Sequence, residues 1–241
     1  MSPPLPRRPQ IPNLQGFTVL RRLDCSYNQI RNLLPLADLD SPAIEEVYVA
    51  NNKVTAIAAL SHLTSLTLLE LGSNRIRTIE GIASLTGLRE LWLGRNRIAQ
   101  VAGLATLTNL RRISLQSNRL TSMAGLEACT LLEELYLSHN GISALGGLGA
   151  LSQLKILDVS SNRLTSLQPG DLAAQTALED LWLNDNKLPA IDAALDRALD
   201  PVRQSLTCIY LEGNPAAHDP QYKRKLLNML PKLKQLDANF L

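Results

Sequence analysis

The sequence predicts an α/β solenoid, a fold in which short coils of chain stack along one axis. Two observations predict it. An asparagine recurs every 22 residues from Asn52 to Asn162, and at slightly longer intervals outside that range. Aliphatic residues keep fixed offsets from each asparagine, so each unit would form one coil. The full series is Asn28, Asn52, Asn74, Asn96, Asn118, Asn140, Asn162, Asn186 and Asn214.

Each unit reads L-x-x-L-x-L-x-x-N-x-(I/L), as in Leu88, Leu91, Leu93, Asn96 and Ile98. This is the leucine-rich repeat pattern. Its L-x-L alternation has a period of two, which predicts a short strand with side chains on opposite faces. The aliphatics that follow are spaced by three, which favours short 3₁₀ turns. We therefore expect a horseshoe with a parallel concave sheet, short 3₁₀ or helical convex limbs, and a C-terminal helical cap.

The recurring asparagine is predicted to be structural. Its amide carries donors and acceptors, so an inward-turned side chain can bond the backbone of its own and adjacent coils. Left unpaired in the interior, it would cost about 1–3 kcal/mol. We therefore assign the asparagine series to a ladder inside the stack, and not to catalysis.

The chain divides into a disordered proline-rich leader (1–10), a solenoid of about nine strands (11–213) and a C-terminal repeat cap (214–241). The leader is followed directly by limb-like spacing, so we expect the first coil to be incomplete and its edge to be frayed or covered. Two helices are expected outside the regular coils. They are Ala193–Leu199, ending near Pro201, and about Pro220–Leu230, with Asp219 as N-cap.

Composition narrows the function classes. The net charge of +2 does not indicate nucleic acid, and the first residues have no apolar segment typical of a secretory signal. The three cysteines are an odd number; Cys25 and Cys129 stand at repeat positions held elsewhere by leucine, as buried hydrophobes would. We expect an intracellular, reducing compartment. An extracellular adhesion protein would need a signal and disulfide-bonded caps.

One strand position, between the two inward leucines, is predicted to face the concave side of the arc. Five of the nine aromatic residues of the chain, including both tryptophans, occur at this position. We name these residues the concave column. It consists of Asp24, Tyr48, Glu70, Trp92, Ser114, Tyr136, Asp158, Trp182 and Tyr210.

Acids accompany the concave column. Glu46, Glu90, Glu134 and Asp180 lie two residues earlier in their strands, on the same face. Aromatic residues are over-represented at binding hot spots, and acids would steer a basic partner. The alternative is ordinary cross-strand stacking. Nine strands spaced about 4.8 Å apart give an arc of roughly 38 Å, which suits a folded protein domain as partner.

A basic residue follows the asparagine in six coils. This ridge could contact acidic groups on a partner, or it could be a solvated face that keeps the protein soluble. Its members are Lys53, Arg75, Arg97, Arg119, Arg163 and Lys187.

No common enzyme motif is present: the sequence lacks a P-loop, a G-x-S-x-G elbow, H-E-x-x-H and C-x-x-C. The three histidines lie on a limb, beside a ladder asparagine and in the cap, and suggest no metal cluster. We expect no catalytic residue, no metal and no cofactor.

Several variable segments, beyond the repeat consensus, resemble the protein phosphatase 1 regulatory subunit 7 family, over about residues 14–240. The segments that carry the resemblance are Leu69–Ile76, Leu115–Leu120, Glu134–Ile142, Trp182–Asn186, Asn214–Pro215 and Asp219–Lys225.

The resemblance implies a non-enzymatic scaffold subunit of nucleus and cytoplasm, a monomer on its own, whose concave face binds the catalytic subunit of protein phosphatase 1. It implies neither nucleic acid nor membrane as partner. This family normally has more N-terminal repeats, which leaves the contacts of Asp24 and Tyr48 open. The alternative is another intracellular adaptor, serving the cytoskeleton, cilia or RNA processing. The implied contact residues are Asp24, Tyr48, Glu70, Trp92, Asp158, Asp180, Trp182 and Tyr210, with Tyr136 added from its column position.

Overall fold

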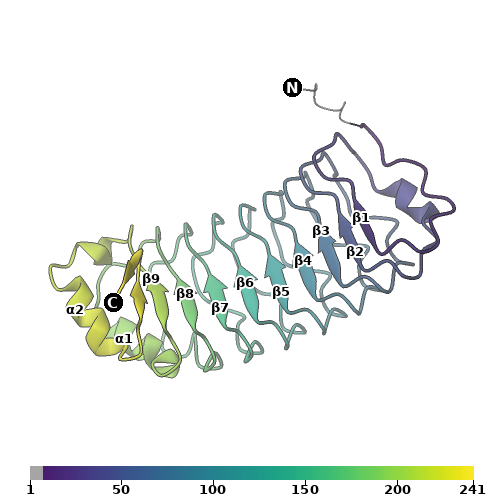
Figure 1. Ribbon diagram of the computed structural model, residues 1–241. Coiled ribbons are helices and arrows are strands. Elements are labelled where there is room, and N and C mark those ends of the chain that lie inside the picture. The colour runs from purple at the N-terminus through teal and green to yellow at the C-terminus, as the bar shows by residue number, and fades with distance from the viewer. Residues whose placement is uncertain (1–7) are drawn as a thin grey trace.

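The computed structural model describes residues 8–241; residues 1–7 of the predicted leader lie outside the described residues. It confirms the solenoid. Within residues 8–241, eleven strands form one sheet in sequence order, parallel as far as β10 and ending in an antiparallel β11 (Figure 1). The strands are β1 Arg22–Asp24, β2 Glu46–Tyr48, β3 Leu68–Glu70, β4 Glu90–Trp92, β5 Arg112–Ser114, β6 Glu134–Tyr136, β7 Ile156–Asp158, β8 Asp180–Trp182, β9 Cys208–Tyr210, β10 Gln235–Leu236 and β11 Asn239–Phe240.

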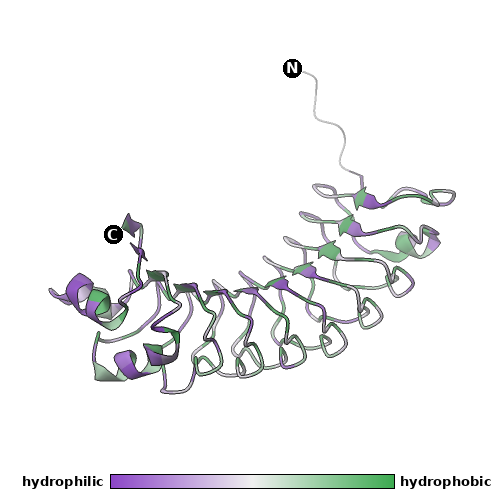
Figure 2. Ribbon diagram, turned by 60° about the horizontal axis from the view of Figure 1, so that its bottom comes forward, coloured by the Kyte–Doolittle hydropathy of each residue, from purple (hydrophilic) through white to green (hydrophobic). Residues whose placement is uncertain are grey.

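The core lies between the sheet and the convex limbs. From β2 to β9 the middle residue of each strand and the residue just after the strand point inward, so Leu69, Leu71, Leu91 and Leu93 are fully buried. Each coil stacks its leucines on those of the next, and the sheet lines the inner side of the bend (Figure 2). Because one coil has no second layer of its own, this burial exists only in the stack.

The convex limbs are built from tight turns. In a typical limb the Leu63 amide donates to the Leu60 carbonyl (2.9 Å) and the Leu66 amide to the Leu63 carbonyl (3.1 Å). These bonds join residues three apart, as the aliphatic spacing predicts. Regular helix is confined to longer limbs and the cap: η1 Leu34–Asp38, α1 Ala193–Leu199, η2 Asp200–Val202, η3 Pro215–His218 and α2 Tyr222–Met229.

The asparagines form a ladder of hydrogen bonds between coils. The side-chain nitrogen of Asn74 donates to the carbonyls of Leu71, in its own coil, and of Val49, in the preceding coil, both at 2.9 Å. Its side-chain oxygen accepts from the amide of Val54 at 2.9 Å. Asn52, Asn96, Asn118, Asn140, Asn162, Asn186 and Asn214 repeat this pattern.

A left-handed residue precedes every ladder asparagine. Its positive φ turns the chain out of the strand and into the limb, at a conformation that L residues adopt at some cost. Only the last coil uses glycine there. The residues are Tyr27, Asn51, Ser73, Arg95, Ser117, His139, Ser161, Asp185 and Gly213, with φ between 51° and 71°.

The first coil is held to the segment before it. The Arg8 amide donates to the Asn28 side-chain oxygen, and the Gln29 amide donates to the Arg8 carbonyl, both at 2.8 Å. Arg8 therefore takes part in the ladder, although it belongs to the predicted leader. Within the described residues β1 pairs only with β2; fraying of this edge stays a prediction.

The cap differs in detail from the expected helix. α2 begins at Tyr222, because Asp219 forms a turn: its side chain accepts from the Gln221 amide (2.8 Å) and its carbonyl accepts from the Tyr222 amide (2.9 Å). Asp219 is therefore not the N-cap. At the end of the sheet Asp237 accepts from the amides of Leu211 and Glu212, 2.8 and 2.9 Å away, and from the Tyr222 hydroxyl, 3.0 Å away.

Replacing Gln175 with leucine is expected to raise the melting temperature by a few degrees. Gln175 is fully buried at a limb position held by Leu151 in the preceding coil, and its side-chain oxygen has no hydrogen-bond partner in the described part of the chain. The side-chain nitrogen of Gln175 donates to the Leu148 and Leu151 carbonyls, which also accept hydrogen bonds from backbone amides. An unpaired buried acceptor costs about 1–3 kcal/mol.

Thermal unfolding measures this effect, and Leu151→Gln is the matched control, expected to lower the melting temperature. A lower melting temperature for Gln175→Leu would show that the amide stabilises the stack.

Candidate functional site

The concave column occupies the last residue of each strand from β1 to β9. The parallel pairing places these residues side by side with no shift in register, for example Glu70 opposite Trp92 and Trp92 opposite Ser114. The sheet that carries them lines the inner side of the arc (Figure 2). Identical register in every coil follows from strands of equal length that begin at the same offset from the asparagine.

The aromatic residues of the column form a continuous row from β4 to β9. The Trp92 and Tyr136 rings are 6.2 Å apart between centroids and stacked at 23°. Tyr136 and Trp182 are 6.4 Å apart at 56°, and Trp182 meets Tyr210 edge-on at 5.9 Å and 69°. Such geometries contribute about 0.5–1.5 kcal/mol per pair beyond area burial, so the rings hold one another in place.

The row depends on small residues between the large ones. Trp92, Tyr136 and Trp182 come from alternate strands, about 9.6 Å apart at the usual strand spacing. Their rings close that distance by leaning over the intervening residues, so Ser114 is 2% and Asp158 is 4% exposed. The sequence shows that large and small column residues alternate from Trp92 to Trp182. That the large rings cover the small residues follows only from the register of the strands.

Asp158 therefore does not present its carboxylate as the resemblance implies. Its side chain accepts from the Ser160 amide (2.9 Å) and hydroxyl (2.6 Å) beneath the rings. This burial removes Asp158 from the residues that a partner could reach in this conformation. Its role here is to support the turn after β7.

The acids beside the column hold its rings. Glu46 accepts from the Tyr48 hydroxyl at 3.0 Å, and Glu134 accepts from the Tyr136 hydroxyl at 2.9 Å. Glu90 accepts from the Trp92 indole nitrogen at 3.2 Å. Burial, and then the bond to the acid, raise the pKa of both tyrosine hydroxyls above the usual value. These acids orient the aromatic side chains.

Two arginines that the sequence analysis did not single out neutralise the same acids. Arg112, on β5, bridges Glu90 at 3.0 Å and Glu134 at 2.8 Å. Arg22 lies 3.3 Å from Glu46, with its guanidinium carbon 4.3 Å from the Tyr48 ring centroid. Both arginines stand at the first strand position, as these acids do. Opposite charges at this position in adjacent coils therefore indicate the ion pairs in the sequence. Glu46, Glu90 and Glu134 are thus internally paired.

Asp180 lies against Cys208 on the next strand. Burial raises the pKa of Asp180, while a hydrogen bond from the Cys208 thiol opposes that rise. Burial and the adjacent carboxylate raise the pKa of Cys208 to about 12, so the thiol stays protonated. The Trp182 indole nitrogen is buried and, unlike that of Trp92, has no hydrogen-bond partner among residues 8–241. All three cysteines are free and buried.

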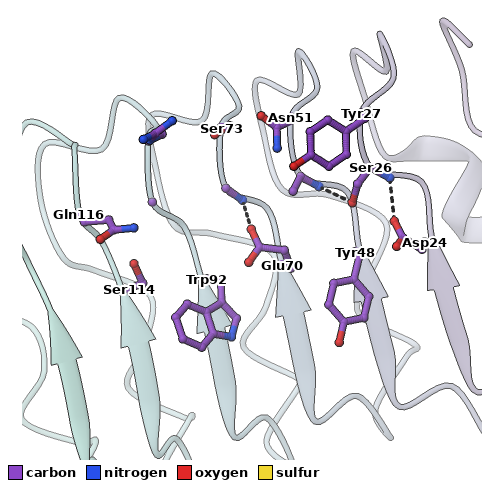
Figure 3. Close-up of a pocket in the computed structure, with 14 residues that line it drawn as sticks. Asp24, Ser26, Tyr27, Tyr48, Asn51, Glu70, Ser73, Trp92, Ser114 and Gln116 are labelled. Carbon is purple, nitrogen blue, oxygen red and sulfur yellow. Dashed lines mark hydrogen bonds between the residues drawn. The ribbon is translucent and has the colours of Figure 1, made fainter. Parts of the chain in front are cut away.

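The N-terminal half of the face is hollowed into a groove of about 910 Å³ over β1 to β5. Two positions after the column members, the groove is lined by the small residues Ser26, Ala50, Gly72 and Gly94. Figure 3 shows the lining side chains along these strands and the turns that follow them. A side-chain carbon on Gly72 would lie 2.6 Å from a Glu70 oxygen, so a larger residue there would displace the Glu70 carboxylate. The lining residues include Asp24, Tyr48, Glu70, Trp92, Arg95 and Gln116.

Glu70 is the open carboxylate of this groove. It lies between Tyr48 and Trp92 in the register, and its carboxylate accepts from the Gly72 amide at 2.6 Å (Figure 3). No lysine or arginine of the described residues forms an ion pair with it. Burial raises its pKa. Asp24, at the groove end, is exposed and accepts from the Ser26 amide at 2.9 Å.

Within residues 8–241 no helix is long and apolar enough to cross a membrane. Across the same range no three histidine, cysteine, aspartate or glutamate side chains are grouped so as to hold a metal ion.

Known proteins resemble this chain in both sequence and fold. Residues 64–106, 108–150 and 130–172 match the family described as leucine rich repeats (2 copies). Over 89% of this chain and 54% of the other, the structure superposes on a leucine-rich repeat protein of Leptospira interrogans with a TM-score of 0.75 and 25% identity. Internalin C2 of Listeria monocytogenes gives a TM-score of 0.69 at 26% identity, over 79% of this chain and 80% of the internalin chain.

Shorter stretches are closer to curated relatives. Protein phosphatase 1 regulatory subunit pprA of Dictyostelium discoideum is 45% identical over 61 residues, which is 25% of this chain and 17% of that protein. The Arabidopsis thaliana protein phosphatase 1 regulatory inhibitor subunit homolog is 47% identical over 64 residues, 27% of this chain and 19% of its own length. Human protein phosphatase 1 regulatory subunit 7 is 51% identical over 37 residues, 15% and 10% of the two chains. The matches thus span less than a fifth of these relatives. The chain has a leucine-rich repeat fold, and it contains segments similar to proteins named protein phosphatase 1 regulatory subunit 7.

Proposed function

We propose that this protein is a non-enzymatic regulatory subunit that binds the catalytic subunit of protein phosphatase 1 through its concave face. The similarity to proteins named as regulatory subunits of that phosphatase supports the partner. The observation that supports the concave face is the row of mutually packed rings from Trp92 to Tyr210.

The aromatic row suits a docking surface because it is already ordered. Trp92 and Tyr136 are fixed by each other and by hydrogen bonds to Glu90 and Glu134, so little side-chain entropy is lost on binding. Both rings remain partly exposed. Ordered, half-buried aromatic side chains are the usual centre of a protein interface.

The acidic end of the surface supplies the charge that the row lacks. Glu70 and Asp24 have no cationic partner within the described residues, whereas Glu46, Glu90 and Glu134 do. A basic side chain of the phosphatase would pair with Glu70 between the Tyr48 and Trp92 rings, where a cation also meets aromatic faces. Contacts by Tyr48, Glu70, Trp92, Tyr136, Trp182 and Tyr210 form the proposed interface, with Asp24 and Asp180 at its margins.

The proposal extends to location and assembly. The protein would act in nucleus and cytoplasm, as a monomer until it meets the phosphatase, without a cofactor. The arc of nine concave strands, roughly 38 Å long at about 4.8 Å per strand, matches a folded domain in size.

The double variant Trp92→Ala/Trp182→Ala is expected to lose capture of protein phosphatase 1 catalytic subunit from a native lysate. It removes both tryptophans from the row and leaves Tyr136 without its ring neighbours. Retained capture would refute the concave-face assignment.

The matched control is Phe17→Ala/Phe240→Ala, which removes two exposed aromatic rings outside the column. It should capture as well as wild type. If wild type captures other proteins and no phosphatase, and the tryptophan variant loses those proteins, the chain is instead another intracellular adaptor.

A further inference from the structure

The turns at the carboxyl ends of the strands carry an almost unbroken positive charge. We name the turns 50–55, 72–77, 94–99, 116–121, 138–143, 160–165 and 184–189 the carboxyl edge. Their only acid is Asp185. Their basic residues are Lys53, Arg75, Arg77, Arg95, Arg97, Arg119, Arg163 and Lys187.

None of these cations is neutralised within the described part of the chain. The nine ion pairs there involve Arg21, Arg22, Arg111, Arg112, Lys155, Arg203 and Lys225, and none involves the carboxyl edge. At the opposite edge of the sheet, where the strands begin, Arg111 and Lys155 share Glu133. The two edges therefore differ: one is self-neutralised, and the other is not.

The ladder fixes the spacing of the free cations. The Arg97 amide donates to the Ile76 carbonyl and the Arg119 amide to the Ile98 carbonyl, both at 2.8 Å, next to a ladder asparagine. The arginine side chains of the ridge are exposed. From Lys53 to Lys187 six coil intervals of about 4.8 Å give a ridge roughly 29 Å long.

We propose that the carboxyl edge binds an extended acidic peptide segment, lying across the coils beside the concave groove. About nine residues at roughly 3.3 Å each would span the ridge. The planar guanidinium of arginine matches a carboxylate with two parallel hydrogen bonds, and most of the ridge is arginine. The turns of the carboxyl edge contain no tryptophan, tyrosine or phenylalanine on which a base could stack, which disfavours single-stranded nucleic acid.

The test uses a fluorescein-labelled peptide of twelve alternating aspartate and glutamate residues, with binding measured by fluorescence anisotropy at about 50 mM salt. The variant Arg75→Glu/Arg97→Glu/Arg119→Glu is expected to bind at least tenfold more weakly than wild type. The control Lys223→Glu/Arg224→Glu/Lys232→Glu changes the net charge equally, at exposed residues outside the ridge, and should stay within twofold. Equal weakening in both variants, or no binding by wild type, overturns the proposal.

Two further variants and one further ligand complete the test. Arg75→Gln/Arg97→Gln/Arg119→Gln should also bind at least tenfold more weakly, and it serves if the charge-reversed variant fails to fold. Trp92→Ala/Trp182→Ala should retain peptide binding, which separates this site from the concave face; loss there would overturn the separate site. If a twelve-nucleotide thymidine oligomer binds more tightly than the peptide through the same arginines, the peptide assignment is wrong.

Discussion

Replacing Asn96 with alanine is expected to lower the free energy of unfolding by about 3 kcal/mol. The Asn96 side chain accepts from the Ile76 amide (2.9 Å) and donates to the carbonyls of Leu71 and Leu93 (both 3.0 Å). It is 9% exposed, so water cannot replace these bonds without opening the stack. Each buried group left without a partner costs about 1–3 kcal/mol. Urea unfolding followed by circular dichroism measures the loss.

The neighbouring residue supplies the control. Arg97→Ala removes an exposed side chain from the same turn and should change stability by less than about 0.5 kcal/mol. A change below about 1 kcal/mol for Asn96→Ala would mean that the ladder contributes little to coupling between coils.

Glu70→Gln is expected to weaken binding to protein phosphatase 1 catalytic subunit about tenfold while leaving the fold intact. The substitution removes the charge in the groove and keeps the shape of the side chain, and one charge-assisted bond contributes about 1.5–3 kcal/mol. Because burial raises the pKa of Glu70, its charge is lost at a higher pH than that of an ordinary carboxylate. On acidification, the affinity should therefore begin to fall at a higher pH than it would if the contact used an exposed glutamate. Calorimetric titration at several pH values measures both effects.

Asp158→Asn is the matched comparison. It makes the same chemical change at a column carboxylate that lies beneath the Tyr136 and Trp182 rings and bonds Ser160. It should lower stability by about 1 kcal/mol and leave the affinity of the folded protein within twofold. If Asp158→Asn weakened binding as much as Glu70→Gln, the rings would have to part in the complex.

The repeat pattern identified most of the fold, because a 22-residue period leaves one way to bury every aliphatic face. The prediction of a helix at Ala193–Leu199 is confirmed, and the structure adds its cap, in which Asp192 accepts from the Ala194 and Leu195 amides. The predicted start of α2 is wrong, because Asp219 forms a turn instead of a cap. The pattern within a single repeat also gave no sign that Arg22 and Arg112 pair with Glu46 and Glu90, because these ion pairs join side chains of neighbouring strands.

The sequence by itself determined the coil, the inward leucines, the asparagine ladder and the column on the concave face. These depend on local period, which a single chain displays. Only the tertiary structure decided which column residues are open. Asp158 and Glu70 stand between aromatic neighbours in the same way, yet the rings close over Asp158 and leave Glu70 in a groove. The reason is physical: closure depends on side-chain directions and distances between strands, which exist only once the coils stack.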